Sequence, residues 1–122
     1  MRPSALVVED DGPTRALLKQ LLSLEGFEVE VAVDGERATD AMLQHDYDVV
    51  LLDIILPKRS GTEVMDVLVR ERPEILERII VVTGVHSDEI RALFPSITSV
   101  MGKPVIPARL LESVRRVSGR LT

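Results

Sequence analysis

The strongest constraint on the fold of this chain is an alternation of short apolar runs with segments of helical spacing. Each apolar run ends at a charged, polar or turn residue. The runs span residues 5–8, 27–33, 49–52, 79–82 and 97–101. Strands that alternate with helices in this way are typical of βαβ units, so the sequence predicts a parallel sheet with helices on both faces.

The segments between the runs carry signals for helix starts and ends. Pro13 suits the first turn of a helix that Gly26 closes, and Asp34 is a plausible N-cap for the next helix. A third helix follows Ser60–Gly61 and ends before Pro73. A short helix is expected over 87–93, and Pro107 opens the last one.

The third run, 49–52, is continuously apolar rather than alternating, which indicates a strand buried on both faces. Right-handed crossovers then give a doubly wound sheet. We therefore predict an α/β fold of the flavodoxin-like kind, with five parallel strands in the order 2-1-3-4-5. The 122 residues fit one domain over 1–122.

Composition excludes several classes of function. The chain has no cysteine, which rules out a disulfide framework or a thiolate zinc site. A net charge of −5 and only three aromatic residues argue against nucleic-acid binding. No apolar run approaches the ~20 residues of a membrane span, and no signal peptide opens the chain. We expect a cytoplasmic domain without a nucleic-acid or membrane partner.

Ligands of doubly wound sheets bind at the carboxyl ends of the strands. In this chain those ends carry polar residues that would converge on one crevice. They are Glu9, Asp10 and Asp11 after the first strand, Asp53 after the third, Thr83 after the fourth and Lys103 after the fifth.

Each of these residue types has a chemical use in such a crevice. Clustered carboxylates repel one another, and Mg2+ relieves that repulsion with the oxygen ligands that it prefers. Asp53, at the tip of a buried strand, can act as a nucleophile and form an aspartyl phosphate. Lys103 supplies a point charge for the carboxylate and for phosphoryl oxygens, and the Thr83 hydroxyl can donate to another of those oxygens.

At these positions the chain resembles the receiver domain of two-component response regulators, the CheY-like superfamily. The resemblance covers nearly the whole chain. Its motifs are Val7-Val8-Glu9-Asp10, Leu51-Leu52-Asp53-Ile54-Ile55-Leu56-Pro57 with Gly61, Val81-Val82-Thr83-Gly84, and Lys103-Pro104.

The resemblance implies a role for each matching residue. Asp53 would be the phosphoacceptor, with Thr83 as the switch hydroxyl and Lys103 as the lysine of the site. Glu9, Asp10, Asp53 and the backbone carbonyl of Ile55 would bind Mg2+. The phosphodonor would be a histidine kinase or a histidine phosphotransfer protein. It would meet a surface made of Thr14, Arg15, Leu18, Lys19, Val105 and Ile106.

Two features depart from the family pattern. Family members usually carry Tyr or Phe three positions before the lysine, where this chain has Val100, so the usual aromatic readout is absent at this switch position. The stretch between Thr83 and Lys103 is also shorter than usual, which predicts a short fourth helix. The resemblance allows a homodimer through the fourth and fifth helices, and no output domain is expected within the chain.

The function expected from these residues is phosphoryl transfer from phosphohistidine onto Asp53, followed by a conformational switch. We expect a signalling phosphoacceptor rather than an enzyme, with slow dephosphorylation because Ile55 and Val85 offer no group to position a water. The alternative is a receiver-like protein-interaction module that is not phosphorylated. A phosphatase of the haloacid-dehalogenase type would need an acid where Ile55 stands. A flavodoxin-type binder would need a phosphate loop after the first strand, where Glu9, Asp10 and Asp11 would repel phosphate.

Overall fold

The computed structural model describes residues 2–84, 87–97 and 99–119, so Val85 lies outside the described residues. The strands are β1 (Ser4–Val8), β2 (Glu28–Ala32), β3 (Val49–Leu52), β4 (Ile79–Thr83) and β5 (Ser99–Gly102). The helices are α1 (Gly12–Leu24), α2 (Gly35–Gln44), α3 (Gly61–Glu71), η1 (Pro73–Arg78), α4 (Ser87–Leu93) and α5 (Pro107–Val117).

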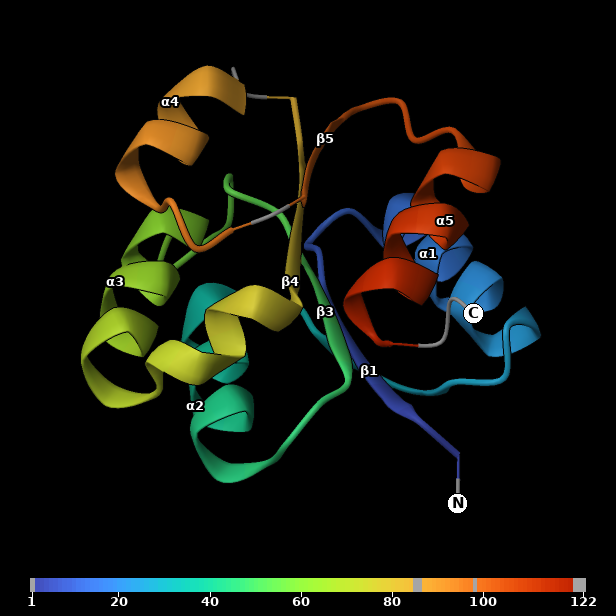
Figure 1. The fold of residues 1–122 in the computed structure, drawn as a ribbon, viewed down its shortest axis with the longest axis horizontal. Coiled ribbons are helices and arrows are strands. Elements are labelled where there is room, and N and C mark those ends of the chain that lie inside the picture. The colour runs from blue at the N-terminus through green and yellow to red at the C-terminus, as the bar shows by residue number, and fades with distance from the viewer. Residues whose placement is uncertain (1, 85–86, 98, 120–122) are drawn as a thin grey trace.

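The five strands form one parallel sheet in the order β2-β1-β3-β4-β5. The predicted α/β fold, with its doubly wound sheet, is confirmed. Figure 1 shows α1 and α5 on one face of the sheet and α2, α3 and α4 on the other. Within the described part of the chain, no helix is long and apolar enough to cross a membrane.

Two hydrophobic clusters hold these layers together. Val50 and Leu52 of β3 pack in a cluster with α2, α3, η1 and α4, which we call the α2–α4 cluster. Val49 and Leu51 pack on the opposite face with α1 and α5, in the α1–α5 cluster. Successive side chains of a strand point to opposite faces, so a strand covered on both faces must be apolar at every position. This explains the continuous apolar run of β3.

The helix starts are fixed by caps that the sequence partly reveals. Asp34 caps α2 and accepts a hydrogen bond from the Arg37 amide, as predicted. Asp11 caps α1 in the same way through the Thr14 amide. At α3, Ser60 and Glu63 form a reciprocal capping box. Each cap satisfies an amide that would otherwise lack a helical partner.

Three elements differ from the sequence prediction. The 3₁₀ helix η1 was not predicted, because six residues opened by a proline carry too little periodicity to be recognised. The second strand is shorter than 27–33, since the Phe27 amide bonds to the Leu22 carbonyl at the end of α1. The last strand begins at Ser99 rather than at Ile97, whose amide instead donates to the Phe94 carbonyl across a turn.

The amino end of α2 contacts the loop that follows β3. The Gly35 amide donates to the Pro57 carbonyl at 3.2 Å. A Cβ on Gly35 would lie 1.8 Å from the carbonyl oxygen of Arg59, which is far inside van der Waals contact. Lys58, between these two loop residues, has a φ of 68°, in the left-handed region. Glycine at position 35 therefore lets α2 pack directly on this loop.

Replacing Gly35 with alanine should destabilise the fold by about 1–3 kcal/mol, because the backbone of the loop must move to accommodate the Cβ. Gly102→Ala is the matched control, since nothing lies within 4 Å of its Cβ position. Urea unfolding of both variants measures the difference. Equal stabilities would show that the loop yields without strain.

Candidate functional site

The ends of β1 and β3 place two buried carboxylates side by side. Val8 pairs with Leu52 in the sheet, and the Asp53 amide donates to the Val8 carbonyl at 3.1 Å. Glu9 and Asp53 therefore leave adjacent strand ends together, with side chains that are only 2% and 7% exposed. Asp10 is exposed beside them, and carboxylate oxygens of the three residues lie within 4.8 Å of one another.

Lys103 links the two buried carboxylates. Its Nζ donates to Glu9 Oε1 at 2.6 Å and to Asp53 Oδ2 at 2.7 Å. The lysine follows β5, and its amide donates to the Thr83 carbonyl at the end of β4. The peptide bond between Lys103 and Pro104 is cis. One ammonium thus joins groups supplied by β1 and β3 from the far side of β4.

The other carboxylate oxygen of Asp53 is held by the loop after β3. Asp53 Oδ1 accepts hydrogen bonds from the Ile54 amide at 2.6 Å and the Ile55 amide at 3.3 Å. Gly61 closes this loop, because its amide donates to the Ile54 carbonyl at 2.8 Å. A Cβ on Gly61 would lie 2.3 Å from the Asp53 carbonyl oxygen, so a larger residue would push the loop away from Asp53. Both oxygens of the Asp53 carboxylate are therefore fixed in direction.

Burial sets the protonation behaviour of the cluster. Burial of Glu9 raises the pKa of that carboxyl, although its hydrogen bonds with Lys103 and with the Asp11 amide act in the opposite direction. Burial opposes the charge of Lys103, but its hydrogen bonds to Asp53 and Glu9 outweigh this effect and raise the pKa of the ammonium group. The lysine therefore keeps its charge at neutral pH.

The remaining predicted site residues lie around this centre. Thr83 is fully buried at the end of β4, and Ile55 is 66% exposed on the loop after Asp53. Val100 pairs with Val81 across the sheet and packs, half-buried, against the α2–α4 cluster. The roles of the Thr83 hydroxyl, of the Ile55 carbonyl and of Val100 remain predictions.

Part of the predicted partner surface forms a pocket of about 460 Å3 between α1 and the loop after Lys103. Thr14, Leu18 and Val105 line it, together with Leu17, Lys103 and Pro104. Leu18 is also a core residue, at 2% exposure. Leu17 was missed by the sequence prediction, and it offers an apolar surface that is 45% exposed. Helical spacing alone did not distinguish this exposed leucine from its buried neighbours.

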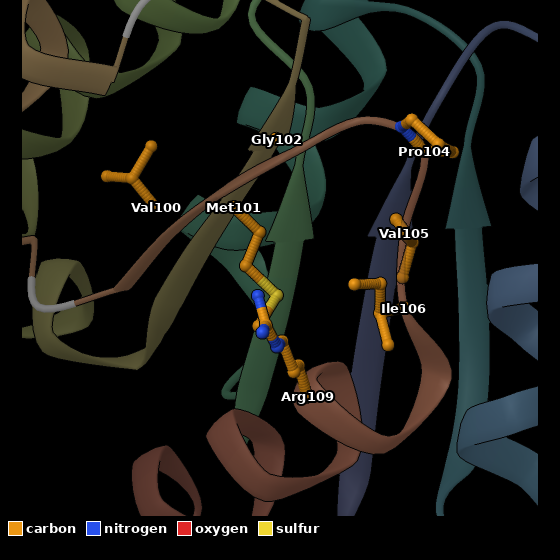
Figure 2. Close-up of a pocket in the computed structure, with 7 residues that line it drawn as sticks. All are labelled: Val100, Met101, Gly102, Pro104, Val105, Ile106 and Arg109. Atoms are coloured by element: carbon orange, nitrogen blue, oxygen red, sulfur yellow. The ribbon is translucent and has the colours of Figure 1, made fainter.

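The other predicted surface residues lie elsewhere. Ile106 lines a second pocket, of about 290 Å3, beside β5. Figure 2 shows this pocket, with Met101 on the side of Arg109 and Val100 pointing to the other side of the strand. Lys19 is exposed on α1. Arg15 is not a freely solvated surface residue, because its Nη1 donates to the carbonyl oxygens of Glu9 and Asp10.

The donor set fits a magnesium ion. Three carboxylates offer hard oxygen ligands within a small radius, which Mg2+ prefers over nitrogen or sulfur. Two of these residues are held by hydrogen bonds to Lys103 or to backbone amides. A carboxylate beside a fixed ammonium and a group of oxygen atoms that could hold a metal suits phosphoryl transfer, which depends on positioning and charge neutralisation.

Comparisons with known proteins find relatives over nearly the whole chain. The response regulator receiver domain, as a protein family, matches residues 5–115. The transcriptional regulatory protein CpxR of Escherichia coli K12 is 33% identical over 115 residues, which cover 94% of this chain and 49% of CpxR. TcrA of Mycobacterium tuberculosis H37Rv is 35% identical over 115 residues, which cover 94% of this chain and 46% of TcrA. The chain thus spans about half the length of these relatives.

Solved structures show the same fold. A CheY-like response regulator receiver domain protein from Methanospirillum hungatei has a TM-score of 0.86 at 30% identity, over 98% of this chain and 95% of that one. The response regulator TrrA of Thermotoga maritima, solved in complex with Mg2+ and BeF, has a TM-score of 0.82 at 29% identity. That match covers 94% of this chain and 98% of TrrA.

Replacing Glu9 with glutamine should raise the melting temperature of the metal-free protein at neutral pH. A carboxyl whose pKa is raised in the folded state favours folding when it is protonated, so the ionised Glu9 destabilises the fold. The advantage of Glu9→Gln should vanish as the pH falls below the ordinary range of a glutamate. Thermal unfolding of both proteins in chelator, from neutral pH to below the ordinary range of a glutamate, measures the difference in melting temperature. A lower melting temperature for Glu9→Gln at neutral pH would mean that the bond to Lys103 outweighs burial.

Proposed function

This chain belongs to the response regulator receiver domain family of two-component systems, and from that premise we propose that Asp53 is its phosphoacceptor. The observation that carries the proposal is the Lys103 ammonium, which bonds to Asp53 and Glu9 where β1 and β3 end. A buried aspartate that only ended a strand would need a charged partner, but it would not need the acidic neighbours Glu9 and Asp10.

The phosphoryl donor in this proposal is a phosphohistidine. A carboxylate oxygen of Asp53 attacks the phosphorus and forms a P–O bond while the P–N bond to the imidazole breaks. The leaving nitrogen takes the electron pair of that bond. Lys103 lies 2.7 Å from Asp53 Oδ2 and can follow the negative charge onto the phosphoryl oxygens. The Ile54 amide keeps the carboxylate oriented through Oδ1.

Glu9, Asp10 and Asp53, with the backbone carbonyl of Ile55, would hold a Mg2+ ion. The bound ion would neutralise the negative charge of the carboxylates and of the entering phosphoryl group. Two observations support this assignment. The three carboxylates offer oxygen atoms within 4.8 Å of one another, and the related regulator TrrA was solved in complex with Mg2+ and BeF.

Phosphorylation would shift an equilibrium between inactive and active conformations. Thr83 is the proposed switch hydroxyl, because it ends β4 next to the strand that carries Asp53. Val100 lacks a ring, so the readout would rely on packing of β5 against the α2–α4 cluster. Ile55 offers no polar side chain to orient a water, which supports slow dephosphorylation. The chain would thus catalyse only its own phosphorylation and hydrolysis.

The proposed donor is a histidine kinase or a histidine phosphotransfer protein, in the cytoplasm. It would dock on the pocket between α1 and the loop after Lys103, where Leu17, Leu18 and Val105 offer apolar surface beside the acidic site. Lys19 and Ile106 would extend this surface. A homodimer through α4 and α5 remains a further proposal for the whole protein.

A second candidate is a receiver-like interaction module that is not phosphorylated. Val100 favours it, because the residue that usually reports phosphorylation is missing. The cluster of three carboxylates argues against it, since binding a protein partner would not require Glu9, Asp10 and Asp53 to lie so close together. Chemistry at Asp53 separates the two candidates.

Incubation with acetyl phosphate and Mg2+ should add one phosphoryl group to the chain, detected by intact-protein mass spectrometry. Asp53→Asn and chelation of Mg2+ should each abolish the adduct, because the nucleophile or the charge neutralisation is lost. Asp66→Asn, at an exposed position of α3, is the matched control and should react like the wild type. An unmodified wild-type chain under several small donors would favour the interaction module.

A charge in the proposed docking pocket should separate the two kinds of donor. Leu17→Glu should slow phosphotransfer from an autophosphorylated histidine kinase by about tenfold or more, since a charged side chain replaces an apolar contact. Acetyl phosphate makes no such contact, so its rate should stay within about twofold of the wild type. Phosphate-transfer assays with a kinase that phosphorylates the wild type measure both rates. Equal decreases in the phosphorylation rate with both donors would show that this pocket is not the docking site.

A further inference from the structure

Arg15 turns its side chain back from the first turns of α1 onto the loop between β1 and α1. Its Nη1 donates to the carbonyl oxygen of Glu9 at 3.0 Å and to that of Asp10 at 3.2 Å. The residue is half-buried, whereas an arginine on an exposed helix face normally extends its charged head into water. One guanidinium nitrogen therefore contacts the backbone of the first two of the three acidic residues that follow β1.

These two carbonyl groups need a donor from outside the sheet. Val8 is the last residue of β1, so the carbonyls of Glu9 and Asp10 lie beyond the strand ladder. Two further hydrogen bonds hold Glu9: its amide N–H donates to the Ala32 carbonyl, and its carboxylate accepts from the Lys103 ammonium. Asp10 is exposed, and Arg15 donates a hydrogen bond to the backbone carbonyl of Asp10. Arg15 thus acts where the acidic loop has the weakest support from the sheet.

The charge of Arg15 and its hydrogen bonds have opposite effects on a bound cation. A positive charge near the acidic cluster repels Mg2+, so its removal by itself would tighten binding. The hydrogen bonds fix the backbone that carries two ligands, so their removal would loosen the site and weaken binding. The sign of the change in Mg2+ affinity therefore shows which effect dominates.

We propose that Arg15 is a positioning residue for the metal site, holding the Glu9 and Asp10 backbone so that their carboxylates meet Asp53. This inference rests on the proposed function, in which those carboxylates bind Mg2+. It assigns to Arg15 a role in holding the loop after β1 rather than in contacting a phosphodonor.

The variant Arg15→Met keeps an unbranched side chain and removes both the charge and the donors. Substitution of groups that hold metal ligands typically weakens binding 10–100-fold, and we expect about tenfold for Arg15→Met. Arg15→Lys keeps the charge but lacks the planar guanidinium, so it should show a smaller loss in the same direction. Arg70→Met removes an exposed arginine from the last turn of α3 and should leave Mg2+ affinity unchanged.

Isothermal titration calorimetry with Mg2+ on the whole chain measures these affinities, and thermal unfolding in chelator verifies that each variant folds. A Mg2+ affinity equal to or tighter than that of the wild type in Arg15→Met would overturn the inference, because Arg15 would then act only as a charge. If Arg15→Met does not fold, Arg15→Lys decides by the same comparison. Absence of Mg2+ binding in the wild type would instead overturn the metal site of the proposed function.

A second measurement separates positioning from a general structural role. With acetyl phosphate as donor, Arg15→Met should need about ten times more Mg2+ for half-maximal phosphorylation, in line with its weaker binding. Its rate at saturating Mg2+ should return to near the wild-type value, since Asp53 and Lys103 are unchanged. A plateau rate that stays low, with normal Mg2+ dependence, would show that Arg15 acts on another step and contradict the assignment.

Discussion

The hydrogen bonds of Lys103 to Glu9 and Asp53 are the interaction on which the site depends, and they join residues that are 94 and 50 positions apart. They exist only because the strand order puts β1, β3, β4 and β5 side by side. The lysine leaves β5 and reaches across the end of β4 to β3 and β1, while its amide bonds to the Thr83 carbonyl. A different strand order would have separated these three side chains, so the chemistry of the site depends directly on the topology of the sheet.

The acidic groups suited to the proposed phosphoryl transfer lower the stability of the fold. Burial raises the pKa of Glu9, which means that ionisation of this carboxyl is less favourable in the folded protein than in the unfolded chain. Lys103 compensates part of the negative charge. With all four groups ionised, Glu9, Asp10, Asp53 and Lys103 carry two net negative charges, the deficit that one divalent cation fills. A core built for stability alone would not keep unbalanced acids at this position.

The sequence was sufficient for the parts of the molecule that follow from local patterns. Four-residue apolar runs such as 49–52 marked the strands, and Asp34 marked a helix start, because both signals are contained in neighbouring residues. Among contacts between distant segments, the meeting of Lys103 with Glu9 and Asp53 followed from the predicted strand order, but contacts that do not follow from that order were not predictable. The carbonyl contacts of Arg15 depend on how α1 leaves the sheet, and the close approach of Gly35 to Arg59 depends on the path of a loop. Neither leaves a periodic signal in the chain.

In the proposed switch, the missing ring at position 100 would leave signal transmission to the packing around the fourth helix. α4 has seven residues, too few to be stable without tertiary contacts, so its position depends on apolar anchors such as Ile90 and the following Phe94. These anchors belong to the same α2–α4 cluster against which Val100 packs. A small branched side chain at position 100 cannot rotate between two sites as a ring can. Any movement at Thr83 that reaches this face must therefore pass through the packing of the cluster itself, and the short helix is the element least able to resist it.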